Sequence, residues 1–204
     1  MEVYFDHSAT TRCSDGAKHK MVQALSEDYG NPSSLHGKGM EGEQYIRDAS
    51  AKIAKTMKVN PSELIFTSGG TESNNLAILG AAMANKRSGM HLITTKIEHP
   101  AVAAPIKFLE EQGFSVTYLN VDQDGIISLE ELLEAVTPET ILVSIMYVNN
   151  EIGAVQPIQE AAEAIRAKNP GALFHVDAIQ AYGKYNIHPK KLGVDLLSAS
   201  SHKI

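Results

Sequence analysis

The residues of this chain with the clearest chemical potential are polar side chains that directly follow short apolar runs. Near the C-terminal end, "DLLSASSHKI" carries Ser200, His202 and Lys203, and "FHVDA" places Asp177 at the end of an apolar run. A lysine that follows a buried strand beside a phosphate can form a Schiff base with an aldehyde. A carboxylate at the position of Asp177 is costly to bury and needs a cationic partner, which a salt bridge or a protonated pyridine nitrogen would provide.

Two glycines and a threonine in "FTSGGTESNN" indicate an anion site. Glycine lets the backbone approach an anion closely, and the start of a helix offers unpaired N–H groups and a positive dipole end. Gly70 and Thr71 are therefore candidates to hold a phosphate group. The stretch matches neither Gly-x-Gly-x-x-Gly nor the Gly-Lys-Ser/Thr of a Walker loop, which disfavours dinucleotide and nucleoside triphosphate sites. For this stretch alone, a tight turn with Thr71 as helix N-cap is an equally good interpretation.

Three further polar residues, His99, Asn150 and Gln180, follow other apolar runs. Alone, each is most simply a loop residue that makes hydrogen bonds. Beside a planar cofactor, however, an imidazole can stack on the ring and exchange protons near neutral pH. Amide groups can contact a phenolic oxygen or a substrate carboxylate. Together with Lys203, Asp177 and the phosphate candidates, these residues describe a pyridoxal 5'-phosphate site, in which the acid keeps the ring acting as an electron sink.

An alternation of strands and helices must position these residues. It predicts a three-layer α/β fold with a parallel sheet, in which ligands bind outside the carboxyl ends of the strands. The run at 140–148 is almost continuously apolar, which is typical of a strand buried on both faces. The strands are expected at 63–67, 90–97, 114–121, 140–148, 172–178 and 195–200, and the helices at 40–59, 71–85, 101–112, 128–136 and 157–169.

Composition narrows the class of protein. The net charge of -6 argues against a nucleic-acid or anionic membrane partner, which would need clustered Lys and Arg. The sequence shows no signal peptide and no apolar stretch long enough to span a bilayer. The single cysteine, Cys13, excludes an internal disulfide framework and a cysteine-based metal cluster, and it fits a reducing cytoplasm. The eight histidines are scattered, so no metal site is expected.

Seven stretches, in order, resemble the motif series of the NifS/IscS-type cysteine desulfurases, within the class V aminotransferase family of fold-type I pyridoxal phosphate enzymes. They are "YFDHSATT", "NPSSLHGKG", "FTSGGTESNN", "EHPAV", "VNNEIGAVQPI", "HVDAIQ" and "SASSHK". The resemblance covers essentially all 204 residues. It implies a three-layer α/β/α large domain with a mostly parallel sheet. Residues 1–204 would be the N-terminal segment and most of that domain, without the small C-terminal domain.

The resemblance also implies a role for each candidate residue. Lys203 would form the Schiff base with pyridoxal 5'-phosphate, and His99 would stack on its ring; these two are the expected catalytic residues. Asp177 would pair with the pyridine nitrogen and Gln180 with the phenolic oxygen, while Asn150 would lie beside the cofactor near the substrate carboxylate. The residues expected to hold the phosphate are Gly70, Thr71, Ser200 and His202.

In this family, L-cysteine is converted to L-alanine and an enzyme-bound persulfide, which supplies sulfur for iron–sulfur clusters or other transfer pathways. The resemblance places the sulfur-accepting cysteine, the arginine that grips the substrate carboxylate and the small domain beyond Lys203. No motif gives Cys13 the accepting role. We therefore expect an N-terminal portion of a desulfurase, inactive by itself. The resemblance further implies a cytoplasmic homodimer with sulfur-acceptor or scaffold proteins as partners.

Two alternatives remain at the level of the sequence. One is a related class V aminotransferase or a selenocysteine lyase that uses the same lysine. The other is a non-catalytic module that keeps the fold for dimerisation or partner binding.

Overall fold

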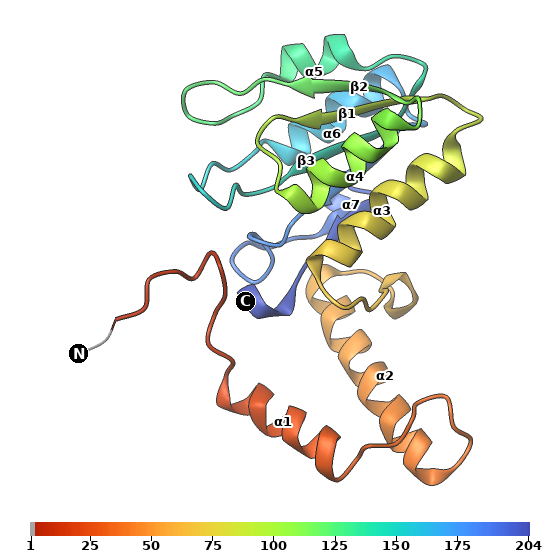
Figure 1. The fold of residues 1–204 in the computed structure, drawn as a ribbon, viewed down its shortest axis with the longest axis vertical. Helices are drawn as coiled ribbons and strands as arrows, with labels where there is room; N and C mark the ends of the chain where they lie inside the picture. Colours follow the sequence, from red (N-terminus) through yellow and green to blue (C-terminus); the bar gives the residue numbers. More distant parts are fainter. Residues whose placement is uncertain (1–2) are drawn as a thin grey trace. The chain divides into compact units, whose positions relative to one another are not determined.

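The computed structural model describes residues 3–204, which fall into two compact units that divide between Phe66 and Thr67. Figure 1 shows the chain coloured along its sequence, with the first unit from red to orange and the second from yellow to blue. Among the described residues, no helix is long and apolar enough to cross a membrane.

The first unit is helical. Helix α1 (Asp15–Ser26) begins after Ser14, whose hydroxyl accepts a hydrogen bond from the N–H of Ala17 at 3.2 Å, and it buries no residue. Helix α2 (Gly37–Met57) overlaps the helix predicted at 40–59, begins three residues before it and ends two residues before it, with Lys58 as a left-handed C-cap. A short 3-10 helix, η1 (Pro61–Glu63), follows. The sequence patterns did not predict α1, because no apolar stripe marks a buried face on it.

The strand predicted at 63–67 is wrong. Glu63 ends η1, and from Leu64 (φ -97°, ψ 132°) the backbone is extended, but in the part of the chain that the structure describes no strand pairs with 64–67. Ile65 is 75% exposed and Phe66 is 54% exposed. Branched and aromatic residues favour a strand only where a partner and a packed face are present, and neither is present here.

The second unit is built on a five-stranded parallel sheet in the order β2-β1-β3-β4-β5. All five of these strands were predicted, and the four helices predicted in this unit are present as well. Each element begins and ends within three residues of its expected bounds. In chain order the elements are α3 (Gly70–Asn85), β1 (His91–Thr95), α4 (Pro100–Glu111), β2 (Ser115–Leu119), α5 (Leu129–Ala135), β3 (Thr140–Met146), α6 (Ile158–Lys168), β4 (Leu173–Asp177), α7 (Pro189–Leu192), β5 (Leu196–Ser198) and the 3-10 helix η2 (Ser201–Lys203).

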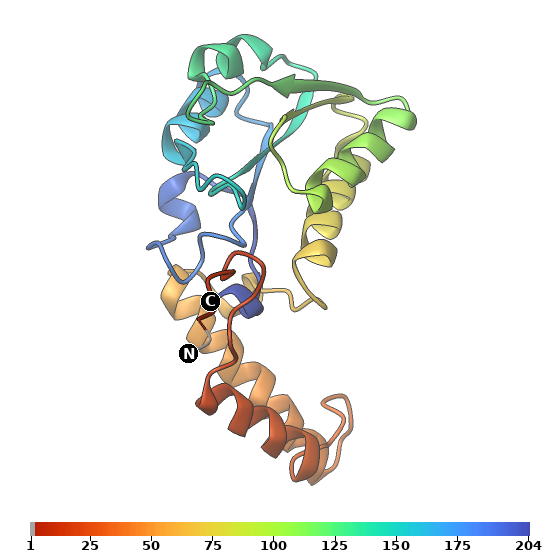
Figure 2. The ribbon, with the colours of Figure 1, turned by 60° about the vertical axis from the view of Figure 1, so that its left-hand side comes forward.

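Helices cover both faces of this sheet. On one face, Ile78 of α3 and Ile106 of α4 pack against Leu92 and Leu142 of the strands. On the other face, Leu132 of α5 and the apolar side of α6 pack against the remaining strand side chains. Figure 2 shows the sheet between the two helix layers. All seven residues of β3 are buried, as predicted for a strand covered on both faces.

The strand order positions the polar loops. The chain passes from β1 outward to β2 and then returns to the opposite side of β1 to form β3. In an open parallel sheet, this reversal leaves a crevice between the loops that leave β1 and β3 at their carboxyl ends, where ligands bind. The loop after β1 carries His99, and the loop after β3 carries Asn150.

Candidate active site

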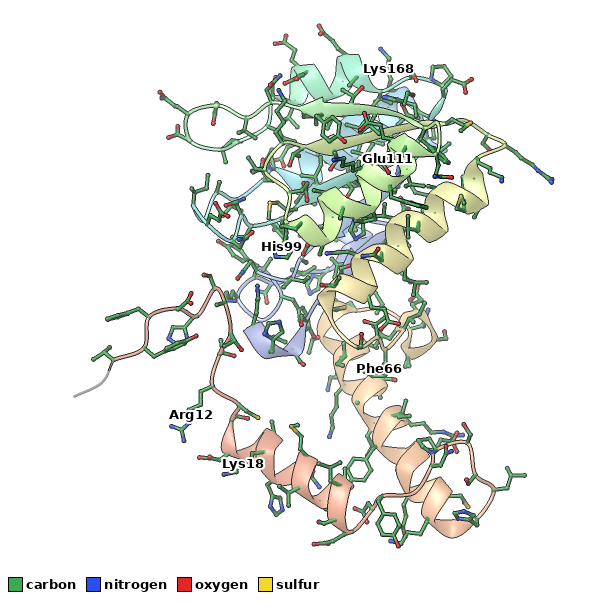
Figure 3. The ribbon with its side chains drawn as sticks, in the orientation of Figure 1. Arg12, Lys18, Phe66, His99, Glu111 and Lys168 are labelled. Atoms are coloured by element: carbon green, nitrogen blue, oxygen red, sulfur yellow. The ribbon has the colours of Figure 1, made fainter. Side chains whose placement is uncertain are left out.

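The candidate residues all lie in the second unit, at the carboxyl ends of the strands or at the start of α3. His99 is the N-cap of α4: its Nδ1 accepts a hydrogen bond from the N–H of Ala101 at 3.0 Å. Figure 3 shows His99 at the first turn of α4, at the opposite end of the helix from Glu111. Asp177 is the last residue of β4. Lys203 ends η2, one short turn after β5.

Asp177 is buried, with 5% of its surface exposed. One carboxylate oxygen accepts a hydrogen bond from the side-chain amide of Asn74 at 2.8 Å, and the other accepts one from the N–H of Ile179 at 3.0 Å. Burial raises the pKa of this carboxyl above its ordinary value, although both hydrogen bonds act to lower it. Both donors are neutral, so these hydrogen bonds do not supply the cationic partner that the sequence analysis expected for Asp177.

The structure brings His99 and Lys203 close enough to Asp177 to act on its charge. Both lower the pKa of Asp177, by less than burial raises it. Among residues 3–204, neither makes an ion pair with Asp177. The three residues come from the ends of three different elements, and a ligand at this edge of the sheet would be exposed to all three.

Gly70 places the start of α3 against two other segments of the site. A side-chain carbon added at Gly70 would lie 2.2 Å from Cδ1 of Ile179 and 3.8 Å from Cβ of Ser200. The missing side chain therefore allows the helix start to approach the segments that follow β4 and β5. The helix begins at Gly70 with Gly69 as its N-cap, so Thr71 is the second helical residue and is not the cap.

The other candidates lie at the same edge, with less defined roles. Ser200 and Gln180 are buried, each 9% exposed, while Asn150 is half-buried in the turn after β3. Thr71 and His202 are exposed. The assignment of Thr71, Asn150, Gln180 and His202 to particular cofactor atoms stays a prediction.

Sequence reasoning gave two residues of this site no role. Asn74 donates a hydrogen bond to Asp177, and its own Oδ1 is buried without a hydrogen-bond partner among the residues that the structure describes. Glu98 is the second: burial raises the pKa of its carboxyl to about 8, against hydrogen bonds that lower it. Both stand beside residues that were recognised, Asn74 in the "GGTESNN" stretch and Glu98 directly before His99. Their roles depend on which strands are neighbours, which the spacing along the chain does not reveal.

A buried hydrogen-bond chain supports the sheet behind Asp177. His175 has no exposed surface, and its two ring nitrogens lie 2.8 Å from Oγ of Ser144 in β3 and 3.1 Å from Oγ of Ser198 in β5. Ser198 in turn accepts a hydrogen bond from Ser73 of α3 at 2.9 Å. Burial lowers the pKa of His175 to about 4. The neutral imidazole thus links β3, β4 and β5, and Ser198 connects it to α3.

This histidine predicts a pH dependence of stability. Its pKa is 6.5 in the unfolded chain and about 4 when folded, so between these values the unfolded state binds the extra proton. The free energy of unfolding should therefore fall, by about 3 kcal/mol, as the pH is lowered from about 6.5 to 4. His175→Gln, which cannot titrate, should remove this contribution in urea titrations over that range, whereas His188→Gln should keep it. Parallel curves for His175→Gln and the parent would contradict the prediction.

A family model described as aminotransferase class-V matches residues 3–204. The chain belongs to the class-V aminotransferase family. This family is the one in which the sequence motifs placed the chain.

Within residues 3–204, no three or more His, Cys, Asp or Glu side chains are arranged to hold a metal ion.

Within the class-V aminotransferase family, the chain is similar to proteins named cysteine desulfurase. The cysteine desulfurase IscS of Clostridium botulinum is 46% identical over 202 residues, which cover 99% of this chain and 50% of that protein. The putative cysteine desulfurase IscS 1 of Bacillus subtilis (strain 168) is 47% identical over 202 residues, covering 99% of this chain and 53% of that protein. The chain thus spans about half the length of the curated relatives it matches.

Solved structures agree with these relatives. A NifS-like protein superposes with a TM-score of 0.97 and 44% identity, over 100% of this chain and 56% of that one. SspA, solved in complex with cysteine, gives a TM-score of 0.94 and 40% identity, over 98% of this chain and 57% of that one. The resemblance to NifS/IscS-type cysteine desulfurases and the predicted α/β fold are confirmed.

Proposed function

We propose that the natural protein containing this chain is a pyridoxal 5'-phosphate-dependent cysteine desulfurase. The observation that carries the proposal is the buried carboxylate of Asp177, which has no cationic hydrogen-bond partner among residues 3–204 and stands within electrostatic reach of His99 and Lys203. The likeness to proteins named cysteine desulfurase supports the same reaction. L-cysteine is the proposed substrate, and SspA, a structural relative, was solved with cysteine.

The residues present fit this cofactor. A protonated pyridine nitrogen would supply the positive charge that Asp177 lacks. The start of α3 at Gly70 offers N–H groups for a phosphate, and a Cβ at position 70 would lie 2.2 Å from Cδ1 of Ile179, so a side chain there would displace Ile179. Lys203, at the end of η2, supplies an amine at the same edge of the sheet. We assign Gly70, Thr71, Ser200 and His202 to the phosphate and Gln180 to the phenolic oxygen.

When bound, pyridoxal 5'-phosphate stabilises negative charge at the Cα of an attached amino acid. The residues of this chain would hold and protonate the groups around it. Asp177 would keep the pyridine nitrogen protonated, and His99 would stack on the ring and move a proton. Lys203 would hold the cofactor covalently through Nζ, and Asn150 would orient the substrate carboxylate.

Transfer of the substrate sulfur also requires a nucleophilic thiolate. Cys13 lies in the first unit, before α1, and its thiol is exposed. We assign no sulfur-accepting role to Cys13. We further propose, from the family resemblance, that the protein is a cytoplasmic homodimer that passes sulfur to acceptor or scaffold proteins.

The test is an assay of the natural protein that contains this chain, purified with pyridoxal 5'-phosphate. With L-cysteine and a reductant, it should release alanine and sulfide in equal amounts. Parallel reactions with L-selenocysteine, and with L-alanine and a keto acid, separate the desulfurase from a selenocysteine lyase and an aminotransferase. Release of selenide without sulfide, or amino transfer without sulfide, would replace the proposal by the corresponding alternative. A protein that takes up no cofactor would overturn it.

A further inference from the structure

Glu98 bridges the loop after β1 and the end of β3. Its Oε1 accepts a hydrogen bond from the hydroxyl of Thr95 at 2.8 Å and one from the N–H of Met146 at 2.9 Å. Its Oε2 is buried and has no hydrogen-bond partner in the described part of the chain. Thr95 is the last residue of β1, and Met146 is the last residue of β3. The carboxyl group therefore ties the two strand ends that border the crevice where the sheet order reverses.

Asn149 makes a second tie between the same two loops. Its side-chain amide donates to the carbonyl of Ile97 at 3.0 Å, and its Oδ1 accepts from the N–H groups of Glu151 and Ile152 at 2.9 Å and 3.0 Å. Asn149 is 7% exposed. Ile97 and Glu98 directly precede His99, and Asn149 directly precedes Asn150. His99 and Asn150 thus extend from loops that are joined by partly buried hydrogen bonds between side chains and backbone.

The tie at Glu98 continues to Asp177 through two successive N–H groups of the backbone. Met146 donates to Glu98, and the next residue, Tyr147, donates its N–H to the carbonyl of Asp177 at 2.9 Å. The path from the His99 loop to Asp177 therefore consists of two hydrogen bonds donated by adjacent residues at the end of β3. A side chain that stacks on one part of a ring and a carboxylate that binds another part must keep a fixed separation.

We propose that Glu98 is a positioning residue, whose carboxyl group, held between Thr95 and Met146, keeps His99 at a fixed place relative to Asp177. The proposal rests on the proposed function for its effect on catalysis, but the tie itself is independent of that function. Asn149 assists by joining the same loops. Glu98 acts through His99 and has no assigned contact with substrate or cofactor.

The charge state of Glu98 suits this role and defines the informative variant. Asp177, from β4, is the charged group that acts on Glu98, and no cation pairs with Glu98 among residues 3–204. Burial, more than Asp177, raises the pKa of Glu98 to about 8, so the carboxyl carries a proton at neutral pH. Glutamine has the shape of that neutral acid and keeps a carbonyl oxygen to accept from Thr95 and Met146. Alanine removes the acceptor and leaves the N–H of Met146 unpaired.

The experiment compares Glu98→Ala, Glu98→Gln and the control Glu111→Ala, an exposed residue at the far end of α4, in the natural protein. Amide hydrogen exchange at Met146 and Ala101 reports the tie and the His99 cap. We expect exchange about tenfold faster or more in Glu98→Ala and within about threefold of the parent in Glu98→Gln. In the loaded enzyme, Glu98→Ala should lower kcat about tenfold with KM nearly unchanged, and should shift the pH midpoint of the bound cofactor's absorbance. Glu98→Gln should restore both.

Each other outcome decides against the proposal. Unchanged exchange in Glu98→Ala would show that the tie does not hold the loops. Fast exchange with an unchanged kcat and absorbance midpoint would leave Glu98 a purely structural role. Failure of Glu98→Gln to rescue would show that the acceptor geometry is not sufficient. If Glu98→Ala does not fold, Thr95→Val, which removes one donor to Oε1, must show the same changes at smaller size. If the parent binds no cofactor, the proposed function is wrong. The exchange data then test only whether Glu98 holds the ends of β1 and β3 together.

Discussion

Asp177→Asn is expected to slow exchange of the substrate Cα proton by about two to three orders of magnitude, without weakening the fold. The buried carboxylate is the group that would keep the pyridine nitrogen protonated, and asparagine carries no charge to do so. Loss of a preorganised electrostatic partner of this kind costs about a hundredfold to a thousandfold in rate. The effect should fall on the rate of proton exchange more than on cofactor binding, which the other candidate residues support.

The fold should tolerate this substitution because Asn74 can adapt to it. In the parent, Asn74 donates to Asp177, while its own Oδ1 is buried without a partner within 3–204. If the asparagine at position 177 turns its amide toward Asn74, a rotation of the Asn74 amide would let Oδ1 accept that hydrogen bond. The N–H of Ile179 would keep a carbonyl oxygen to bind.

Stability should even rise slightly at neutral pH in the cofactor-free protein. Burial raises the folded pKa of Asp177, so the folded state favours the protonated acid, and ionisation at neutral pH costs stability. The stabilising contribution is present below the unfolded pKa of 3.8 and is lost as the pH rises through the folded pKa. Asp177→Asn avoids that loss, so its advantage should shrink as the pH is lowered toward 4.

Two measurements separate these effects. Exchange of the Cα proton of cysteine or alanine in deuterated buffer, followed by NMR, reports the chemical step in the loaded enzyme. Urea unfolding without cofactor, at several pH values, reports stability. Asp124→Asn, an exposed residue in the loop after β2, is the matched control and should change neither. Equal proton exchange by Asp177→Asn and the parent, with cofactor bound to both, would refute the role of Asp177.

The sequence predicted the strands of the second unit because their apolar runs are bounded by loops and alternate with helical stripes. The same reasoning failed at 63–67, where the residue types favour a strand but the described chain offers no partner. It also missed α1, whose twelve residues include none that is buried. Patterns predict elements that bury a face within the chain, and they are weakest where burial is absent.

The candidate site was predictable to a different degree. Asp177, His99 and Lys203 could be found because each follows an apolar run, and parallel strands bring their carboxyl ends to one edge. The hydrogen-bonding roles of Glu98, Asn74 and the partners of His175 could not be found in this way. Their hydrogen bonds cross between β1 and β3, or between α3 and the strands β4 and β5, and the spatial order β2-β1-β3-β4-β5 is not the chain order. Residues that hold a site together are identified by neighbours in space, and residues that face a ligand can be identified by position after a strand.

Lys203 should be the residue that reacts with the cofactor aldehyde, and its loss should have the largest effect of any single substitution. Borohydride reduction of the loaded natural protein, followed by peptide mapping, should place the pyridoxyl label on Lys203. The demanding comparison is Lys184, a nearby exposed lysine whose Nζ donates to the backbone carbonyl of Lys203 at 2.8 Å. Lys184 carries the same chemistry close by, so a label confined to Lys203 would reflect the position of its amine within the site.

Lys203→Ala should lower turnover of cysteine by about a thousandfold or more, because one change removes both the covalent hold on the cofactor and an amine that can carry a proton. Lys184→Ala removes only a surface hydrogen bond and should leave label and rate unchanged. A small primary amine such as methylamine, added to Lys203→Ala, should restore part of the rate, since a missing amine can be supplied from solution while a collapsed site cannot be repaired that way. Rescue would therefore assign the loss to chemistry. A label on Lys184, or a Lys203→Ala variant that retains the reducible adduct and full turnover, would move the reactive amine to another lysine and overturn the assignment of the segment after β5.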